Sequence, residues 1–170
     1  MKYRIAIILL IAFGLSACGT RPFVPQEYPL RDGLIPSLNI SGDVVINNSQ
    51  QSENPEIVYS YAGTKLATSY KDITQVMVDQ TKKELGKNAK ISSSENNKSI
   101  DLQVNYLKST YIAFYWKSEL KYDAMLGDGT KISKTVTHGS GNLVQDLNGC
   151  IAESVMDLLN DPKVIEYLSK

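Results

Sequence analysis

The feature that most constrains the fold is a run of alternating apolar and polar residues in the second half of the chain. Residues 100–106 alternate without an exception, which predicts a strand with one buried and one wet face. Residues 112–126 continue the alternation, and residues 127–129 (Gly-Asp-Gly) are a tight hairpin signal. Residues 130–138 return with few apolar side chains and several polar ones, as expected of an edge strand. Together these residues predict an antiparallel meander.

Two longer segments have helical periodicity. Residues 70–85 carry an apolar stripe, with Ser69 placed as the N-cap and Gly86 as the stop. Residues 142–160 repeat apolar side chains at steps of three and four. A short terminal helix is expected after Asp161, which is placed as its cap and is followed by proline.

These elements predict an α+β fold. Three further segments are expected as strands: residues 37–47, 57–62 and 88–93. The order of elements favours a mostly antiparallel sheet, a meander in its C-terminal half, with two main helices packed on one face. Residues 37–170 are expected to form a single α+β domain, since the chain after the leader is long enough for one core.

The N-terminus has the composition of a secretory signal. Residues 1–17 begin with Lys2 and Arg4 and continue as an apolar run. An uncleaved membrane anchor would need about 20 apolar residues, and Gly14 and Ser16 interrupt the run before that length. We therefore expect a signal peptide at residues 1–17.

Leu15-Ser16-Ala17-Cys18, at the end of this segment, resembles the lipobox of bacterial lipoproteins. The resemblance implies that Cys18 receives lipid, palmitate among the acyl chains, and becomes the mature N-terminus. Gly19 in place of aspartate resembles the sorting pattern for the outer membrane. The expected location is the outer membrane, lipid-anchored and facing the periplasm.

Residues 18–36 are expected to form the acylated N-terminus and a proline-rich tether. They hold four of the six prolines in the chain, which resist helix and ladder formation. The alternative is an arm packed along the domain through Leu30, Leu34 and Ile35, all of them apolar.

Little in the sequence indicates catalysis, and we expect no enzyme activity. His138 is the single histidine, and no Gly-x-Ser-x-Gly nucleophile elbow is present. The ligand spacing of a metal site is also missing, so we expect no metal and no cofactor. Cys150 falls on the apolar stripe of the second helix, which predicts a buried, inert thiol.

The charge balance argues against nucleic acid as a partner. The chain has 18 basic and 18 acidic residues, and loss of Lys2 and Arg4 with the leader leaves 16 against 18. No basic surplus is available to neutralise phosphates.

Tyr111 and Tyr115 are the candidate binding residues. Both have the opposite parity from the expected core face, beside Phe114 and Trp116. Aromatic side chains on a wet sheet face are amphipathic anchors for a protein partner, a glycan or a lipid. The alternative is that they pack under the proline-rich arm or against a neighbouring strand. An exposed sheet edge offers a second route, by addition of a partner strand.

The C-terminal part of the chain resembles the YajG-type lipoproteins of Gram-negative bacteria. The resemblance runs through Asp-Leu-Gln-Val in residues 101–104, the Gly-Asp-Gly-Thr-Lys turn at 127–131 and the tail at 148–168. The connection around 107–115 is shorter than in that family, and the segment before Tyr70 differs. The resemblance implies an outer-membrane-attached periplasmic domain, with no established activity to carry over. Cys18 is the only functional residue that it transfers.

The leading hypothesis is a lipid-anchored, non-catalytic binding or assembly module whose partner is an envelope component. The alternative is an accessory lipoprotein subunit of an envelope lipid or lipopolysaccharide transport system. An enzyme would need polar groups converging on a pocket near His138.

Overall fold

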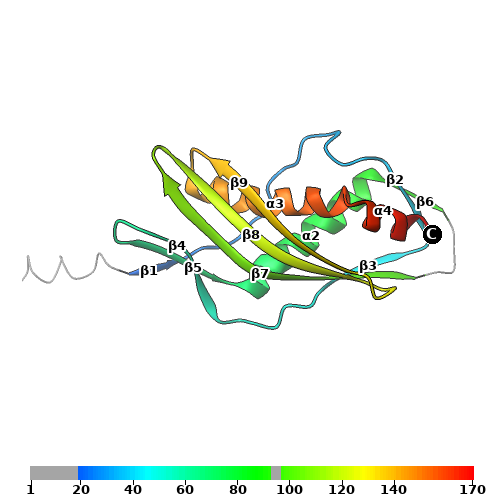
Figure 1. Cartoon of the computed structure of the whole chain (residues 1–170), viewed down its shortest axis with the longest axis horizontal. Helices are drawn as coiled ribbons and strands as arrows, with labels where there is room; N and C mark the ends of the chain where they lie inside the picture. Colours follow the sequence, from blue (N-terminus) through cyan, green and yellow to red (C-terminus); the bar gives the residue numbers. More distant parts are fainter. Residues whose placement is uncertain (1–18, 93–96) are drawn as a thin grey trace, which may run out of the picture.

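Three long strands dominate the second half of the chain. The computed structural model describes residues 19–92 and 97–170, so the expected signal peptide and Cys18 lie outside the described residues. β7 (Lys98–Ile112), β8 (Tyr115–Leu126) and β9 (Lys131–Ser140) pair antiparallel in sequence order. The expected meander is confirmed, and β9 forms an edge of the sheet (Figure 1).

The other side of β7 makes the sheet mixed. β3 (Val44–Asn48) and β4 (Pro55–Tyr61) both run parallel to β7, β3 beside its first residues and β4 beside Ser109. β5 (Thr64–Ser69) returns antiparallel to β4, and β1 (Thr20–Pro22) lies parallel to β5. The expectation of a mostly antiparallel sheet is therefore corrected. The reason is that a helix lies between these first strands and β7, and such a crossover leads to parallel pairing.

A second, two-stranded sheet pairs β2 (Leu38–Ser41) with β6 (Ala89–Ser92) in parallel. Residues 37–47, expected as one strand, are thus divided between two sheets. The division falls at Gly42, whose φ of 83° lies in the left-handed region that glycine adopts without strain.

Three helices complete the described fold: α2 (Tyr70–Asn88), α3 (Leu143–Leu159) and α4 (Pro162–Ser169). Ser69 and Asp161 cap α2 and α4 as predicted, and Asn142 caps α3, each accepting a hydrogen bond from a backbone N–H of the first turn. α2 continues past Gly86, where the sequence predicted its end.

α2 and α3 pack on one face of the main sheet (Figure 1). Thr74 on α2 accepts a hydrogen bond from the backbone N–H of Val104 at 3.0 Å, and the Tyr122 hydroxyl donates to Asp157 on α3 at 3.0 Å. Between sheet and helices lie fully buried apolar side chains, among them Ile73, Met77, Ile100, Leu102, Leu120, Leu147, Ile151 and Val155.

A β-bulge in β7 changes which face the end of that strand presents. Up to Val104 the even-numbered residues are buried, but the pairing register shifts between Val104 and Tyr106. Beyond the shift, Leu107 and Ser109 are the buried residues. One extra residue reverses the alternation of a strand. Tyr111, which the sequence placed opposite the core face, therefore shares the helix-side face.

The proline-rich arm lies along the domain, which is the alternative to a free tether. Phe23 is buried in the core, and the backbone N–H of Gln26 donates to the Asn148 side chain of α3 at 3.1 Å. Tyr28 exchanges two backbone hydrogen bonds with the Gln80 side chain of α2, at 3.4 and 2.7 Å. The arm thus crosses the outer side of both helices.

Candidate functional site

Two hairpin turns lie side by side at one end of the main sheet. One joins β4 to β5 at Ala62 and Gly63, and the other joins β7 to β8 at Ala113 and Phe114. Because β4 runs parallel to β7, the two turns point the same way, away from β3 and the C-terminus (Figure 1). The second turn is a correction, since residues 112–126 were expected to form one continuous strand.

Aromatic side chains join the two hairpins on the helix-side face. The rings of Tyr61 and Tyr111 lie 5.2 Å apart between centroids, and those of Tyr111 and Trp116 lie 5.1 Å apart. The indole N–H of Trp116 donates to the Tyr59 hydroxyl at 3.3 Å. Tilted rings at these separations attract beyond the effect of their buried area. We call Tyr61, Tyr111, Ile112, Phe114, Tyr115 and Trp116 the aromatic tip.

The structure brings the two predicted binding residues to the same turn but on opposite faces. Tyr111 is half-buried against Tyr61 of β4, so for this residue the alternative of packing against a neighbouring strand holds. Tyr115 lies on the outer face of β8, with 43% of its surface exposed. Their role in binding stays a prediction.

Phe114 is the residue of this site that sequence reasoning missed. The sequence placed it on the core face, but it stands in the turn with 90% of its surface exposed. Its φ of 85° and the φ of 33° at Ala113 both lie in the left-handed region, which is uncommon for a bulky residue. The backbone N–H of Phe114 donates to the Tyr111 hydroxyl at 3.2 Å. A strained turn therefore presents a large apolar side chain to solvent.

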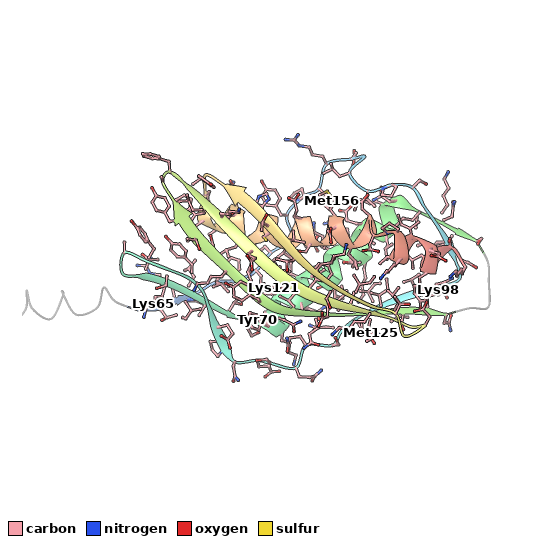
Figure 2. All side chains as sticks on the ribbon, in the orientation of Figure 1. Lys65, Tyr70, Lys98, Lys121, Met125 and Met156 are labelled. Carbon is pink, nitrogen blue, oxygen red and sulfur yellow. The ribbon has the colours of Figure 1, made fainter. Side chains whose placement is uncertain are left out.

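Basic residues stand behind the aromatic tip. Thr20 of β1 pairs with Lys65 of β5, the second residue after the β4–β5 turn. Figure 2 shows Lys65 at the end of the molecule where the described chain begins. Arg21 and Lys117 are exposed in the neighbouring strands β1 and β8. The first described residues of the chain thus lie at the same end as the aromatic tip.

A buried polar cluster lies beneath α3, near the single histidine. Asp146 is fully buried and accepts hydrogen bonds from the hydroxyls of Ser109, at 2.6 Å, and Ser118. Its other oxygen, Oδ1, has no hydrogen-bond partner within the described chain. His138, the cross-strand neighbour of Ser118, lies with Nδ1 3.0 Å from a carboxylate oxygen of Glu153. The Ser118 hydroxyl is fully buried, so this arrangement offers no nucleophile to a substrate.

Cys150 is buried as predicted. Its thiol lies 3.7 Å from the backbone oxygen of Val136, and burial raises the pKa of the thiol far above its ordinary value. Such a thiol is unreactive in the folded protein.

Among residues 19–92 and 97–170, no group of three or more histidine, cysteine or acidic side chains is arranged to hold a metal ion. The same residues form no helix that is long and apolar enough to span a membrane.

A groove of about 760 Å³ runs between the arm and the start of α2. Its lining includes Pro22, Val24 and Pro25 of the arm, Ala67 of β5 and Val76 of α2. The volume lies in the range of small-molecule sites, and its walls are largely apolar.

No protein-family model matches the chain, and no curated protein matches it. The resemblance to the YajG-type lipoproteins therefore stays a prediction.

Two solved structures are similar to the chain. One is the lipoprotein GNA1162 from Neisseria meningitidis, with a TM-score of 0.35 and 14% identity over 69% of this chain and 96% of that one. The other is a protein from Helicobacter pylori named as a homolog of a neuraminyllactose-binding hemagglutinin, with a TM-score of 0.31 and 10% identity over 84% and 94%. At these scores the likeness carries no argument on function, which rests on the chain's own residues.

Proposed function

We propose that the chain is a lipid-anchored, non-catalytic binding or assembly module at the outer membrane of a Gram-negative bacterium, facing the periplasm. Cys18 carries the lipid, and the aromatic tip meets a component of the envelope. The observation that carries the proposal is Phe114, an exposed aromatic side chain held on a strained turn.

Phe114 supports a binding role because it breaks two local rules at once. A large apolar side chain gains nothing from exposure to water, and a left-handed backbone at a bulky residue costs about 1–3 kcal/mol. No packing contact offsets that cost at a side chain that is 90% exposed. Sites that violate local rules without compensation in the fold are characteristically functional.

The anchor is tested by labelling cells with radioactive palmitate. The wild-type protein should take up label and fractionate with the outer membrane, and Cys18→Ser should do neither. Equal labelling of both proteins would contradict the proposal. Recovery of the labelled wild-type protein in the inner membrane would contradict its location.

The binding surface is tested by placing a photo-crosslinking amino acid at position 115 in cells. Val45, exposed in β3 away from the aromatic tip, is the matched control position. Adducts to a protein, glycan or lipid at 115 but not at 45 are expected. The same adducts at both positions, or none at 115, would contradict a contact at the aromatic tip.

The groove between the arm and α2 favours the second candidate function, an accessory subunit of an envelope lipid or lipopolysaccharide transport system. Its apolar lining at Val24 and Val76 suits an acyl chain. Native mass spectrometry of the purified mature protein would decide between the two. One bound lipid per chain, lost in Val76→Arg, would favour transport, and a lipid-free protein would leave the binding module.

A further inference from the structure

We propose that the aromatic tip is a second membrane contact, which inserts into the interface of the same bilayer that holds the lipid on Cys18. This inference rests on the proposed function, because it takes the acylated N-terminus as given. It names the envelope component that the aromatic tip meets as the lipid surface itself. The argument has three steps: where the chain emerges, what the aromatic tip presents, and how the tip is charged.

The strand register places the start of the chain level with the turns of the aromatic tip. Thr20 pairs with Lys65, and β1 runs parallel to β5, away from the turn at Gly63. Cys18 is two residues before Thr20, so its Cα lies within about 7 Å of the Cα of Thr20. Three strand spacings of about 4.8 Å separate β1 from β7 across the sheet. A lipid on Cys18 therefore enters the bilayer close beside the aromatic tip.

The side chains of the aromatic tip suit the bilayer interface. Phe114 projects from the turn and is wholly apolar, whereas Tyr61 and Tyr115 are half-exposed and carry hydroxyls. Tyrosine and tryptophan gather where hydrocarbon meets lipid headgroups, because one end of the ring is apolar and the other is wet. Phe114 would enter deepest, with the tyrosine hydroxyls at headgroup level.

The charges behind the aromatic tip have the sign that anionic lipids attract. Arg21, Lys65 and Lys117 stand in the strands that lead to the two turns. No aspartate or glutamate occurs in residues 57–71 or 109–118, although the whole chain has equal numbers of acids and bases. Basic side chains next to an apolar insertion bind the phosphates of the same surface.

The packed arm makes this contact an orientation device. Because residues 20–28 are held on β5, α2 and α3, the domain is not suspended on a free tether. With the lipid and the aromatic tip both in the bilayer, the opposite end, at β6 and the C-terminus, points away from the membrane (Figure 1).

Fluorescence quenching in vesicles tests the inference on the mature, acylated protein. Trp116 is the only tryptophan, so Trp116→Phe gives a silent background. Into it we would introduce Phe114→Trp, and separately Ile91→Trp as the control. Ile91 is likewise a large, exposed apolar side chain, 69% exposed, but lies in β6 at the opposite end. The vesicles contain phosphatidylethanolamine and phosphatidylglycerol, with or without brominated acyl chains.

Brominated lipid should lower the emission of the probe at 114 about two-fold or more and leave the probe at 91 nearly unchanged, since only an inserted ring meets the acyl chains. Native Trp116 in the unmodified protein gives a second reading that needs no substitution, with weaker quenching expected at its shallower position.

The possible failures are distinguishable. If the wild-type protein floats with the vesicles but the probes at 114 and 91 are quenched alike, the bilayer contact is wrong while the anchor stands. Protein adducts from position 115 in cells, with no quenching at 114, would assign the aromatic tip to a protein partner and overturn the inference. If the wild-type protein carries no palmitate, the proposed function itself fails.

Discussion

Replacing Phe114 by glycine is expected to make the protein more stable than replacing it by alanine. Both variants lose the phenyl ring, which is 90% exposed in the folded protein and makes little contact there. They differ in the backbone, because alanine keeps the strain of the positive φ of 85° and glycine does not. The comparison therefore isolates the strain in the turn.

The magnitude follows from two opposing contributions. A left-handed backbone at a non-glycine residue costs about 1–2 kcal/mol, and glycine loses about 0.5–1 kcal/mol more backbone entropy on folding than alanine. The Phe114→Gly variant should thus unfold with a free energy about 0.5–1 kcal/mol higher than Phe114→Ala. For a chain of this size that corresponds to a melting temperature about 1–4 °C higher.

Urea unfolding of the mature protein, followed by circular dichroism, measures the difference. Gly129→Ala provides the calibration, since Gly129 has a φ of 87° in the β8–β9 turn and nothing lies within 4 Å of an added Cβ. Its loss of about 1 kcal/mol would report strain alone. If Gly129→Ala is destabilised but the two Phe114 variants are equally stable, the turn at Phe114 is not strained and the reasoning is refuted.

Three further predictions concern the interior and the pH response. Cys150 should react with a thiol reagent only as fast as the protein unfolds, because burial raises its pKa; rapid labelling of the folded protein would contradict its burial. Burial alone would raise the pKa of Asp161, but hydrogen bonds from Lys134 and from the backbone N–H of Lys163 outweigh it and the pKa is lowered. The folded pKa lies below the unfolded one, so this stabilisation is present above the ordinary pKa and is lost as the pH falls; Asp161→Asn should lose stability less steeply than wild type between about pH 4 and 2, in acid titrations followed by circular dichroism. Asp146→Ala should lower the free energy of unfolding in urea by about 2–4 kcal/mol, because two buried serine hydroxyls lose their acceptor, and a cost under about 1 kcal/mol would contradict that role.

The meander and the helices could be predicted because their signals are local. Strict alternation in residues 100–106 and the Gly-Asp-Gly turn require only neighbouring residues. The caps at Ser69 and Asp161 are equally local, and the structure confirms both. Burial of Cys150 followed from helical spacing alone.

The parts that were missed depend on contacts distant in sequence or on unusual backbone. No glycine or proline marks the bulge after Val104, so the face of Tyr111 was predicted wrongly. The turn at Ala113 and Phe114 lacks the Asn-Gly or Asp-Gly signal of left-handed turns, and the alternation reads through it. The mixed sheet arises from pairing of β7 with strands some 50 residues earlier, which periodicity does not reveal.

The candidate site was found in part for the same reasons. Tyr111 and Tyr115 stand out because they are aromatic residues in a strand. The place of Tyr61 beside them requires the pairing of β4 with β7. Phe114 was assigned to the core because its parity matched, and only the turn reveals that it is exposed.

The packed arm has a consequence for biogenesis. Gln26 bonds to Asn148, 122 positions later, and the backbone oxygen of Leu34 accepts from Asn160, 126 positions later. On a chain exported amino end first, these partners cross the membrane near the end of translocation, and contacts so distant in sequence close late. The stretch around the acylation site would thus stay extended and accessible while processing enzymes work on it, and would be sealed onto the helices only afterwards.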